Sequence, residues 1–376
     1  MIAEVAPHVA PEAASVLTAR LLARLRVFAS DAGGLQANAV RPAINALVEL
    51  TAARTEAYSF DATAAACERW MKTLMRGAVE RLKTYSLTPA AINEPQALVC
   101  LYVVGELCMA AMGDPKLDAV PAEGGAGSGA SERREGAAAL HTAAHRALFG
   151  RSVVAVVQAL TARSTTNADG AVATPVSVRA HAFLALGKLC LHDATLAQSC
   201  VTVLVRELTP EAGGDADNAD AVVRSNVLVV LGDLCKQHTG IVERYVPDIA
   251  RCLQDRSPVV RENALLVISS LLLEGFIRLR GPVFFRMLAS FALESHPANP
   301  ESISVASAQA HARMANNVRH TIFEIFARRD DALLPTHFVE AMFVFNDCAD
   351  HPAYRRCVIS SSTVIAFRAN PSHLLT

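Results

Sequence analysis

Aromatic residues and lysine are both scarce in this sequence of 376 residues. Aromatic side chains make up 5% of the chain, whereas hydrophobic residues make up 52%. The core must therefore be aliphatic and alanine-rich, which is typical of helices packed on helices. Only 5 of the 35 basic residues are lysine, and 36 acidic residues bring the net charge to −1. This balance excludes a protein held on nucleic acid by its total charge, although a local basic patch remains compatible with it.

Long apolar runs and a secretion signal are also missing. The most apolar windows, such as residues 264–273, are flanked by charge and are far shorter than the roughly 20 residues of a membrane helix. The N-terminus has neither a basic region nor a long apolar region. The nine cysteines are an odd number and form no Cys-x-x-Cys pair. We therefore expect a reduced, intracellular and soluble chain with no membrane partner.

Motifs for nucleotide binding and catalysis are absent. The sequence has no P-loop, no Gly-x-Ser-x-Gly elbow and no Gly-x-Gly-x-x-Gly after a strand. His141 and His145 have the spacing of a zinc pair, but Thr142 stands where a metalloprotease needs glutamate. Asp330 and Asp331 fall in a loop with nothing to shape them into an acid and base pair. The cysteines fit small buried side chains. We expect no enzyme, no catalytic residue, no cofactor and no metal site.

A repeat is the main positive feature of the sequence. Three segments each begin with a Val-Arg pair: "VRAHAFLALGKLC", "VRSNVLVVLGDLC" and "VRENALLVISSLL". Their arginines are Arg179, Arg224 and Arg261. Eight residues after the first two arginines stand Gly187 and Gly232. The arginines are spaced by 45 and 37 residues, which brackets the period of about 40–47 residues typical of HEAT and armadillo units.

Second helices lie between the arginine-led segments. In residues 239–255 the apolar side chains recur every three or four residues, and residues 196–209 follow the same plan. Pro247 lies inside the first of these segments, where it would kink the helix or mark its first turn. Such helix pairs bury their apolar faces only by stacking on neighbours. We therefore predict an all-α fold, a HEAT/armadillo-type α-solenoid of stacked antiparallel helix pairs.

Changes in composition predict four parts in the chain. Residues 122–136 are rich in glycine, serine and charge, and hold no large apolar side chain that would order them. A shorter acidic loop covers residues 210–220. The predicted parts are N-terminal helical repeats over 1–112, a flexible linker over 113–136, a HEAT-repeat array over 137–353 and a C-terminal tail over 354–376.

The arginine of each repeat has two possible roles. It could line a groove and bind phosphates, or it could pair with an acidic residue at the turn, such as Asp255 ahead of Arg261. A position that recurs in each unit usually serves the stacking geometry, which favours the second role. The expected structural repeat positions are Arg179, Arg224, Asp255, Arg261, Gly187 and Gly232.

Residues 275–287, "GFIRLRGPVFFRM", differ in kind because arginines alternate with phenylalanines in a segment that joins two predicted helices. Basic side chains interleaved with aromatic ones can hold a nucleic-acid backbone. The same composition also occurs at the rim of an ordinary core, where arginine stems cover apolar surface. The candidate contacts with DNA or an acidic partner are Arg278, Arg280 and Arg286.

These segments, taken in order, resemble a known family. The stretches are "VRAHAFLALGKLCLHDATLAQSCVTVLVREL", "VVRSNVLVVLGDLC", "YVPDIARCLQDRSPVVRENALLVISSLLLEGFIRLRGPVFFRM" and "HFVEAMFVFNDC". They are similar to the D-type HEAT-repeat subunit of condensin over residues 96–353, and the FIRLRG-x-x-FFR segment points to the condensin II version. Arg278 and Arg280 match basic positions of the family. Family members are usually several times longer, and the tail after Tyr354 is unlike their continuation.

The resemblance implies a non-catalytic regulatory subunit in the nucleus, on chromosomes. Its implied partners are a kleisin subunit, the SMC ATPase heterodimer of condensin, a second HEAT subunit, and DNA and histone tails in mitotic chromosome condensation. Other HEAT solenoids, such as nuclear transport receptors and phosphatase scaffolds, share the period but lack the FIRLRG-x-x-FFR segment. A helical accessory region of an enzyme is a further alternative.

Overall fold

The computed structural model describes residues 9–26, 36–53, 60–88, 92–112, 151–162, 174–209, 220–295 and 305–328. All regular structure in these ranges is helical, which confirms the prediction of an all-α fold. None of the helices in these ranges combines the length and the apolar character needed to cross a membrane. The predicted linker, the C-terminal tail, the "HFVEAMFVFNDC" stretch, His141, His145, Asp330 and Asp331 lie outside the described residues.

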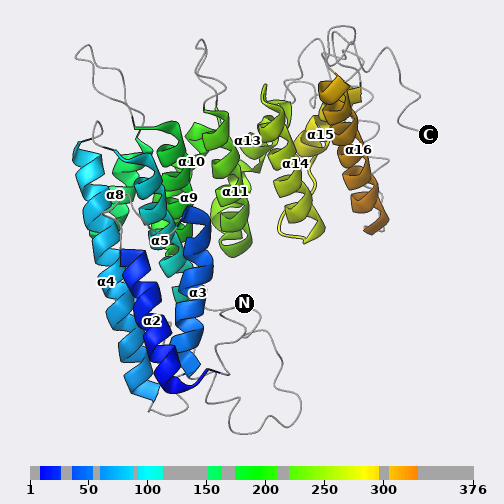
Figure 1. Ribbon diagram of the computed structural model, residues 1–376. Helices are drawn as coiled ribbons and strands as arrows, with labels where there is room; N and C mark the ends of the chain where they lie inside the picture. The colour runs from blue at the N-terminus through cyan, green and yellow to red at the C-terminus, as the bar shows by residue number, and fades with distance from the viewer. Residues whose placement is uncertain are drawn as a thin grey trace, which may run out of the picture. The chain divides into compact units, whose positions relative to one another are not determined.

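The chain divides into two compact units, Met1–Leu196 and Ala197–Thr376. In the first unit, α5 packs against α3, α4 and α9, and α8 packs against α4 and α9 (Figure 1). Its core is mostly aliphatic, with Trp70, Tyr85 and Phe183 as buried aromatic members. The helices of this unit are α2 (Pro11–Arg26), α3 (Ala37–Ala53), α4 (Phe60–Leu87), α5 (Glu94–Met112), α8 (Arg151–Thr161) and α9 (Val176–His192).

The second unit contains the two complete arginine-led repeats. Helix α10 (Ala194–Glu207) crosses the boundary between the units in sequence. In the rest of the unit α11 packs against α14, and α15 packs against α13 and α16. These helices are α11 (Ala221–Gln237), α12 (Thr239–Val242), α13 (Val246–Arg251), α14 (Pro258–Leu273), α15 (Gly281–Ser295) and α16 (Val305–Arg328).

The second helix of the α11 repeat is built from short pieces. Helices α12 and α13 alternate with two 3-10 turns, Glu243–Tyr245 and Cys252–Gln254. Pro247 stands in the first turn of α13, where its missing N–H costs no helical hydrogen bond. Of the two outcomes predicted for this proline, the first ordered turn is therefore the one observed.

The first helices of consecutive repeats, α11 and α14, lie side by side and run parallel. Ser225 on α11 is hydrogen-bonded to Asn263 on α14. Further along both helices, Gly232 on α11 packs against the side chain of Val267 on α14. Because the two contacts follow the same order along both chains, the repeats stack in one direction, as in a solenoid. The HEAT-type prediction is thus confirmed.

Candidate functional site

The loop between α14 and α15 presents two of the three predicted contact arginines to solvent. Arg278 and Arg280 are exposed, whereas Ile277 and Leu279 between and beside them are buried. This alternation is that of an extended segment, in which successive side chains point to opposite sides. The two apolar residues therefore anchor the loop, and both guanidinium groups are held on its outer side.

The path of this loop is set where α14 ends. Gly275 has a φ of +82°, a left-handed conformation that other residues rarely adopt. Its N–H donates to the carbonyl oxygen of Leu272 at 3.2 Å, and the N–H of Ile277 donates to that of Leu271 at 3.2 Å. These bonds satisfy carbonyl groups at the helix end and turn the chain sharply into the arginine-bearing segment.

An exposed ion pair lies beside the loop. The Nη2 of Arg280 is 3.0 Å from the Oε1 of Glu243, and the two side chains are 71% and 42% exposed. Exposed pairs of this kind contribute about 0–1 kcal/mol, so a phosphate can replace the glutamate at little cost. The neighbouring Arg244 is also exposed, and its guanidinium carbon lies 4.8 Å from the centre of the Tyr245 ring. The sequence patterns did not single out Arg244, because its helix reads as an ordinary amphipathic segment.

Arg286 does not join this surface. It lies inside α15 and is 7% exposed, with its Nη1 donating to the Oε1 of Gln254 at 3.4 Å. Phe284 and Phe285 are each 2% exposed. The two phenylalanines therefore belong to the core and offer no stacking surface to bases. A guanidinium buried to this degree does not face solvent, so Arg286 is left out of the contact proposed below.

The repeat arginines are buried rather than lined up on a groove. Arg224 makes a two-point contact with Asp255: Nε lies 2.9 Å from Oδ2, and Nη2 lies 3.0 Å from Oδ1. Both side chains are almost inaccessible, with exposed fractions of 3% and 2%. In this geometry the arginine joins its own helix to the turn that precedes the next repeat helix.

Arg261 has a different partner from the one predicted. Asp255 was expected to pair with it, but the carboxylate is bound to Arg224, and Arg261 reaches only the main-chain carbonyl of Asp255, at 3.0 Å. The Nε of Arg261 instead lies 2.5 Å from the Oε1 of Glu294 on α15. The other oxygen of Glu294 contacts the Nδ1 of His311 on α16. Arg224 and Arg261 thus each bind an acid that lies further along the stack.

The remaining repeat positions are packed. Arg179 and Gly187 are both buried in α9. At Gly232, an added Cβ would lie 3.0 Å from Cγ1 and 3.3 Å from Cγ2 of Val267. The absence of a side chain at this position therefore lets α11 and α14 approach each other closely.

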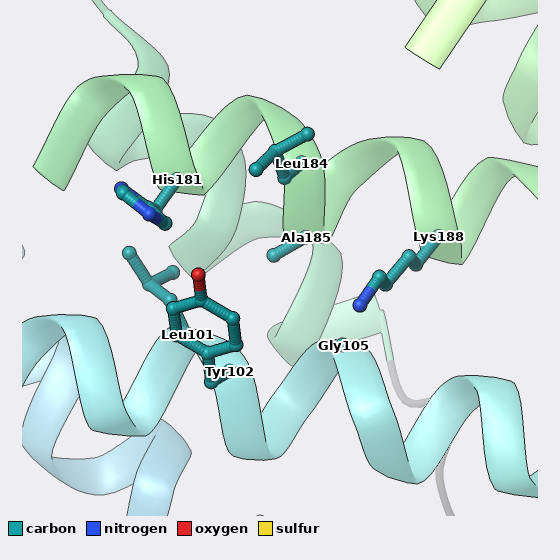
Figure 2. Close-up of a pocket in the computed structure, with 7 residues that line it drawn as sticks. All are labelled: Leu101, Tyr102, Gly105, His181, Leu184, Ala185 and Lys188. Atoms are coloured by element: carbon teal, nitrogen blue, oxygen red, sulfur yellow. The ribbon is translucent and has the colours of Figure 1, made fainter. Parts of the chain in front are cut away.

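A small pocket lies in the first unit, between α5 and α9 (Figure 2). The rings of Tyr102 and His181 are 5.4 Å apart between centres and tilted by 48°. Lys188 crosses over Gly105, which leaves room for its stem, and pairs with the buried carboxylate of Glu106. The other lining residues are Leu101, Leu184 and Ala185. Because its lysine is engaged by a carboxylate and the lining includes no nucleophile beside a base, the pocket does not suit catalysis.

Metal-ligand geometry and reactive thiols are not found in the described part of the chain. No group of three or more histidine, cysteine, aspartate or glutamate side chains converges there. The cysteines in the described ranges are free and buried, and burial raises the pKa of several of their thiols, including Cys67 to about 11 and Cys108 to about 12. Buried neutral thiols fit packing rather than nucleophilic chemistry.

Two family descriptions match consecutive parts of the sequence. Residues 136–208 match the HEAT repeats of proteins like condensin-2 complex subunit D3. Residues 222–333 match the non-SMC mitotic condensation complex subunit 1. The second match covers α11, α14, the arginine-bearing loop and α15.

Individual relatives show similarity to the same family over stretches of different length. Condensin-2 complex subunit D3-L of Xenopus laevis is 33% identical over 182 residues, which is 48% of this chain and 11% of that protein. Condensin-2 complex subunit CAP-D3 of Arabidopsis thaliana is 31% identical over 173 residues, 46% of this chain and 11% of that protein. Condensin complex subunit 1 of Homo sapiens is 33% identical over 104 residues, 28% of this chain and 7% of that protein.

The chain thus spans about a tenth of the length of the condensin-2 relatives, and its similarity to them extends further than its similarity to condensin complex subunit 1. The two family matches follow one another along the chain in the same order as the stretches that carry the resemblance in the sequence. Both family matches, which lie within residues 136–333, and these relatives therefore confirm that the chain resembles the D3-type HEAT-repeat subunits of condensin II.

Proposed function

We propose that this chain is a non-catalytic HEAT-repeat scaffold of a condensin II-type complex, acting in mitotic chromosome condensation in the nucleus. The observation that carries the proposal is the match of both condensin family descriptions, in order, to helices that stack as HEAT repeats. The part that carries the function is the array predicted over residues 137–353. Its partners are a kleisin subunit, the SMC ATPase heterodimer and a second HEAT subunit, and it contacts DNA and histone tails.

The arginine-bearing loop is the proposed DNA contact. Arg278 and Arg280 are exposed on a loop whose apolar residues fix its position, so two guanidinium groups are held ready for adjacent phosphates. Two positive charges cannot hold a duplex alone. The loop therefore acts as one contact among several in the complex, and it positions the protein on the backbone without reading sequence.

Affinity purification of the tagged protein from dividing cells, followed by mass spectrometry, tests the scaffold function. Recovery of a kleisin with paired coiled-coil ATPases is the expected result. Recovery of transport cargo or phosphatase subunits in their place would contradict the proposal and support another HEAT adaptor. A longer transcript that encodes a catalytic fold would support an accessory region of an enzyme instead.

The DNA contact is tested on the affinity-purified complex by fluorescence anisotropy with a short labelled duplex, over a series of salt concentrations. Arg278→Ala combined with Arg280→Ala should weaken binding and lower the slope of log affinity against log salt by about 2, because each phosphate contact contributes about 0.9. The matched control is Arg313→Ala with Arg319→Ala, which removes the same charge from exposed positions on α16. Equal effects of the two double variants would show a general charge effect and exclude a contact through this loop.

A further inference from the structure

Glu243 holds the guanidinium group of Arg280 by a single contact. The Nη2 of Arg280 donates to the Oε1 of Glu243 at 3.0 Å, which joins the arginine-bearing loop to the 3-10 turn Glu243–Tyr245. A guanidinium group carries five N–H donors, and a phosphate can accept from two of them at once. A phosphate can therefore bind Arg280 more strongly than Glu243 does, but it has to displace Glu243 first.

The next residue of this turn carries a positive charge without an acidic partner. Arg244 is exposed, and no carboxylate of the described residues pairs with its guanidinium group. Its contact with the Tyr245 ring restrains the side chain and leaves the charge in place, because the ring has no net charge. Consecutive Cα atoms are about 3.8 Å apart, so Arg244 stands directly beside the residue that reaches Arg280.

The end of the second unit around the loop is positive on balance. Arg244 and Arg278 are exposed and have no acidic partner among the described residues. Arg256 and Glu262, which carry opposite charges, stand at the other end of α14, more than about 15 Å away along the helix. Each acidic side chain described at this end has a partner: Glu243 pairs with Arg280, Asp248 with Arg251 and Glu274 with Lys236, and Asp233 and Glu324 have other contacts.

The arginine-bearing loop presents charge rather than apolar surface. Ile277 and Leu279 are only 2% and 5% exposed, so the two arginines that alternate with them dominate its outer side. Those arginines stand two residues apart in extended chain, which places their Cα atoms about 6.6 Å apart. A peptide partner is recognised through side-chain pockets or strand pairing, whereas a sugar–phosphate backbone is held by charged donors alone. The surface therefore suits DNA phosphates better than an acidic peptide.

We propose that Glu243 and Arg244 set the affinity of the arginine-bearing loop for DNA. Glu243 competes with phosphate for Arg280, and Arg244 supplies a third phosphate contact beside Arg278 and Arg280. The two neighbouring residues thus act in opposite directions on one contact. This proposal rests on the proposed contact of Arg278 and Arg280 with DNA, and it adds a competitor within the chain and a further cation.

Glu243→Gln tests the competition, because it keeps the size of the side chain and removes its charge. Fluorescence anisotropy of the affinity-purified complex with a short labelled duplex should show binding tighter by about two- to fivefold, the range within which an exposed pair can compete. The matched control is Asp248→Asn, which removes the same charge from the exposed pair with Arg251 on α13 and should leave the affinity nearly unchanged.

A double-mutant cycle separates competition at Arg280 from a general effect of charge. In the Arg280→Ala background there is no guanidinium group for Glu243 to occupy, so Glu243→Gln should give no further gain. An equal gain with and without Arg280 would overturn the competition. An unlabelled polyglutamate peptide that displaces the duplex as well as unlabelled DNA of equal charge would assign the surface to an acidic protein and overturn the preference for DNA.

Arg244→Ala tests the third contact. It should weaken binding and lower the slope of log affinity against log salt by about 0.9, the contribution of one phosphate contact. Arg313→Ala on α16 removes the same charge from another exposed position and should leave the slope unchanged. Equal slopes for the Arg244 variant and the parent would exclude Arg244 from the contact.

Arg278→Ala with Arg280→Ala is measured in the same series. If this double variant binds the duplex like the parent, the loop does not contact DNA, and the roles of Glu243 and Arg244 are overturned with it. If the double variant binds more weakly but Glu243→Gln and Arg244→Ala bind like the parent, the loop contact stands and only the roles of Glu243 and Arg244 are overturned.

Discussion

Arg224 and Asp255 lie 31 residues apart in sequence and form a buried, two-point ion pair. The Oδ1 of Asp255 also accepts the N–H of Ser257 at 2.8 Å, directly before α14. One carboxylate therefore binds the helix of the preceding repeat and fixes the turn that begins the next one. The register between the two repeats depends on this single side chain more than on any exposed ion pair of the unit.

We predict that Arg224→Ala lowers the free energy of unfolding by about 3–5 kcal/mol, because it leaves the carboxylate of Asp255 buried without its cation. Urea unfolding of the full chain, followed by circular dichroism, measures the change. The control is Lys236→Ala, whose ion pair with Glu274 is 36% and 48% exposed and should contribute at most about 1 kcal/mol. Similar losses for the two variants would contradict a special role for the buried pair.

Substitution of the repeat arginine Arg261 should affect mainly thermal stability, whereas substitution of the loop arginines Arg278 and Arg280 should affect mainly DNA affinity. Arg261→Ala removes the arginine partner of the buried Glu294 and leaves it only the contact with His311 among those described, so it should lower thermal stability more than it lowers DNA affinity. Arg278→Ala with Arg280→Ala should lower DNA affinity and leave the melting temperature nearly unchanged, because both side chains are exposed. Equal behaviour of the two variants in both assays would remove the distinction between structural and contact arginines.

Gly232→Ala should destabilise the protein although alanine is the better helix former. The new Cβ would lie 3.0 Å from Val267, whose branched side chain has one strongly preferred rotamer in a helix and cannot easily turn away. The double variant with Val267→Ala should restore part of the loss. Gly240→Ala is the matched control, since an added Cβ there meets nothing within 4 Å and gains up to about 1 kcal/mol of helix propensity. Stabilisation by Gly232→Ala would show that the helices can move apart.

The repeat itself was predictable from the sequence, but its ionic partners were not. Helical periodicity and the Val-Arg spacing identified the first helices, and the arginines were expected to pair with acids. The sequence indicates a partner for Arg261 at the turn just before it, whereas Glu294 lies 33 residues later, much as Asp255 lies 31 residues after Arg224. A search for acids 31 to 33 residues after each of these two arginines would have found both pairs.

The arginines of residues 275–287 show the same limit. Arg278, Arg280 and Arg286 all lie in a stretch rich in arginine and phenylalanine, but only the first two belong to a segment with alternating burial. Arg286 follows Phe284 and Phe285 inside α15, where residues 283–290 are all buried. Residue type indicates a possible basic contact, whereas the boundary between loop and helix decides which arginines reach solvent. That boundary is set at Gly281, which the composition does not distinguish from a loop residue.

The buried thiols link packing to pH. Burial raises the pKa of Cys100, Cys108 and Cys252 from its ordinary value of 9.0 to about 12, and that of Cys67 and Cys235 to about 11. Between pH 9 and these values, the thiols ionise in the unfolded chain but stay protonated in the folded one. The unfolded state then binds fewer protons, so their contribution to stability is fully present below pH 9 and is lost as the pH rises.

We therefore predict that the described cysteines resist a thiolate-selective reagent in the folded protein at pH 8, and react once the chain is unfolded in urea. The experiment uses Cys348→Ser with Cys357→Ser, so that only the cysteines of the described ranges are counted. The urea concentration at half unfolding should decrease when the pH is raised from 8 to 10. The decrease should be smaller when Cys100 and Cys252 are replaced by alanine in the same background. Rapid labelling of the folded variant would show that these helices open readily, and the thiols would then not serve as buried packing groups.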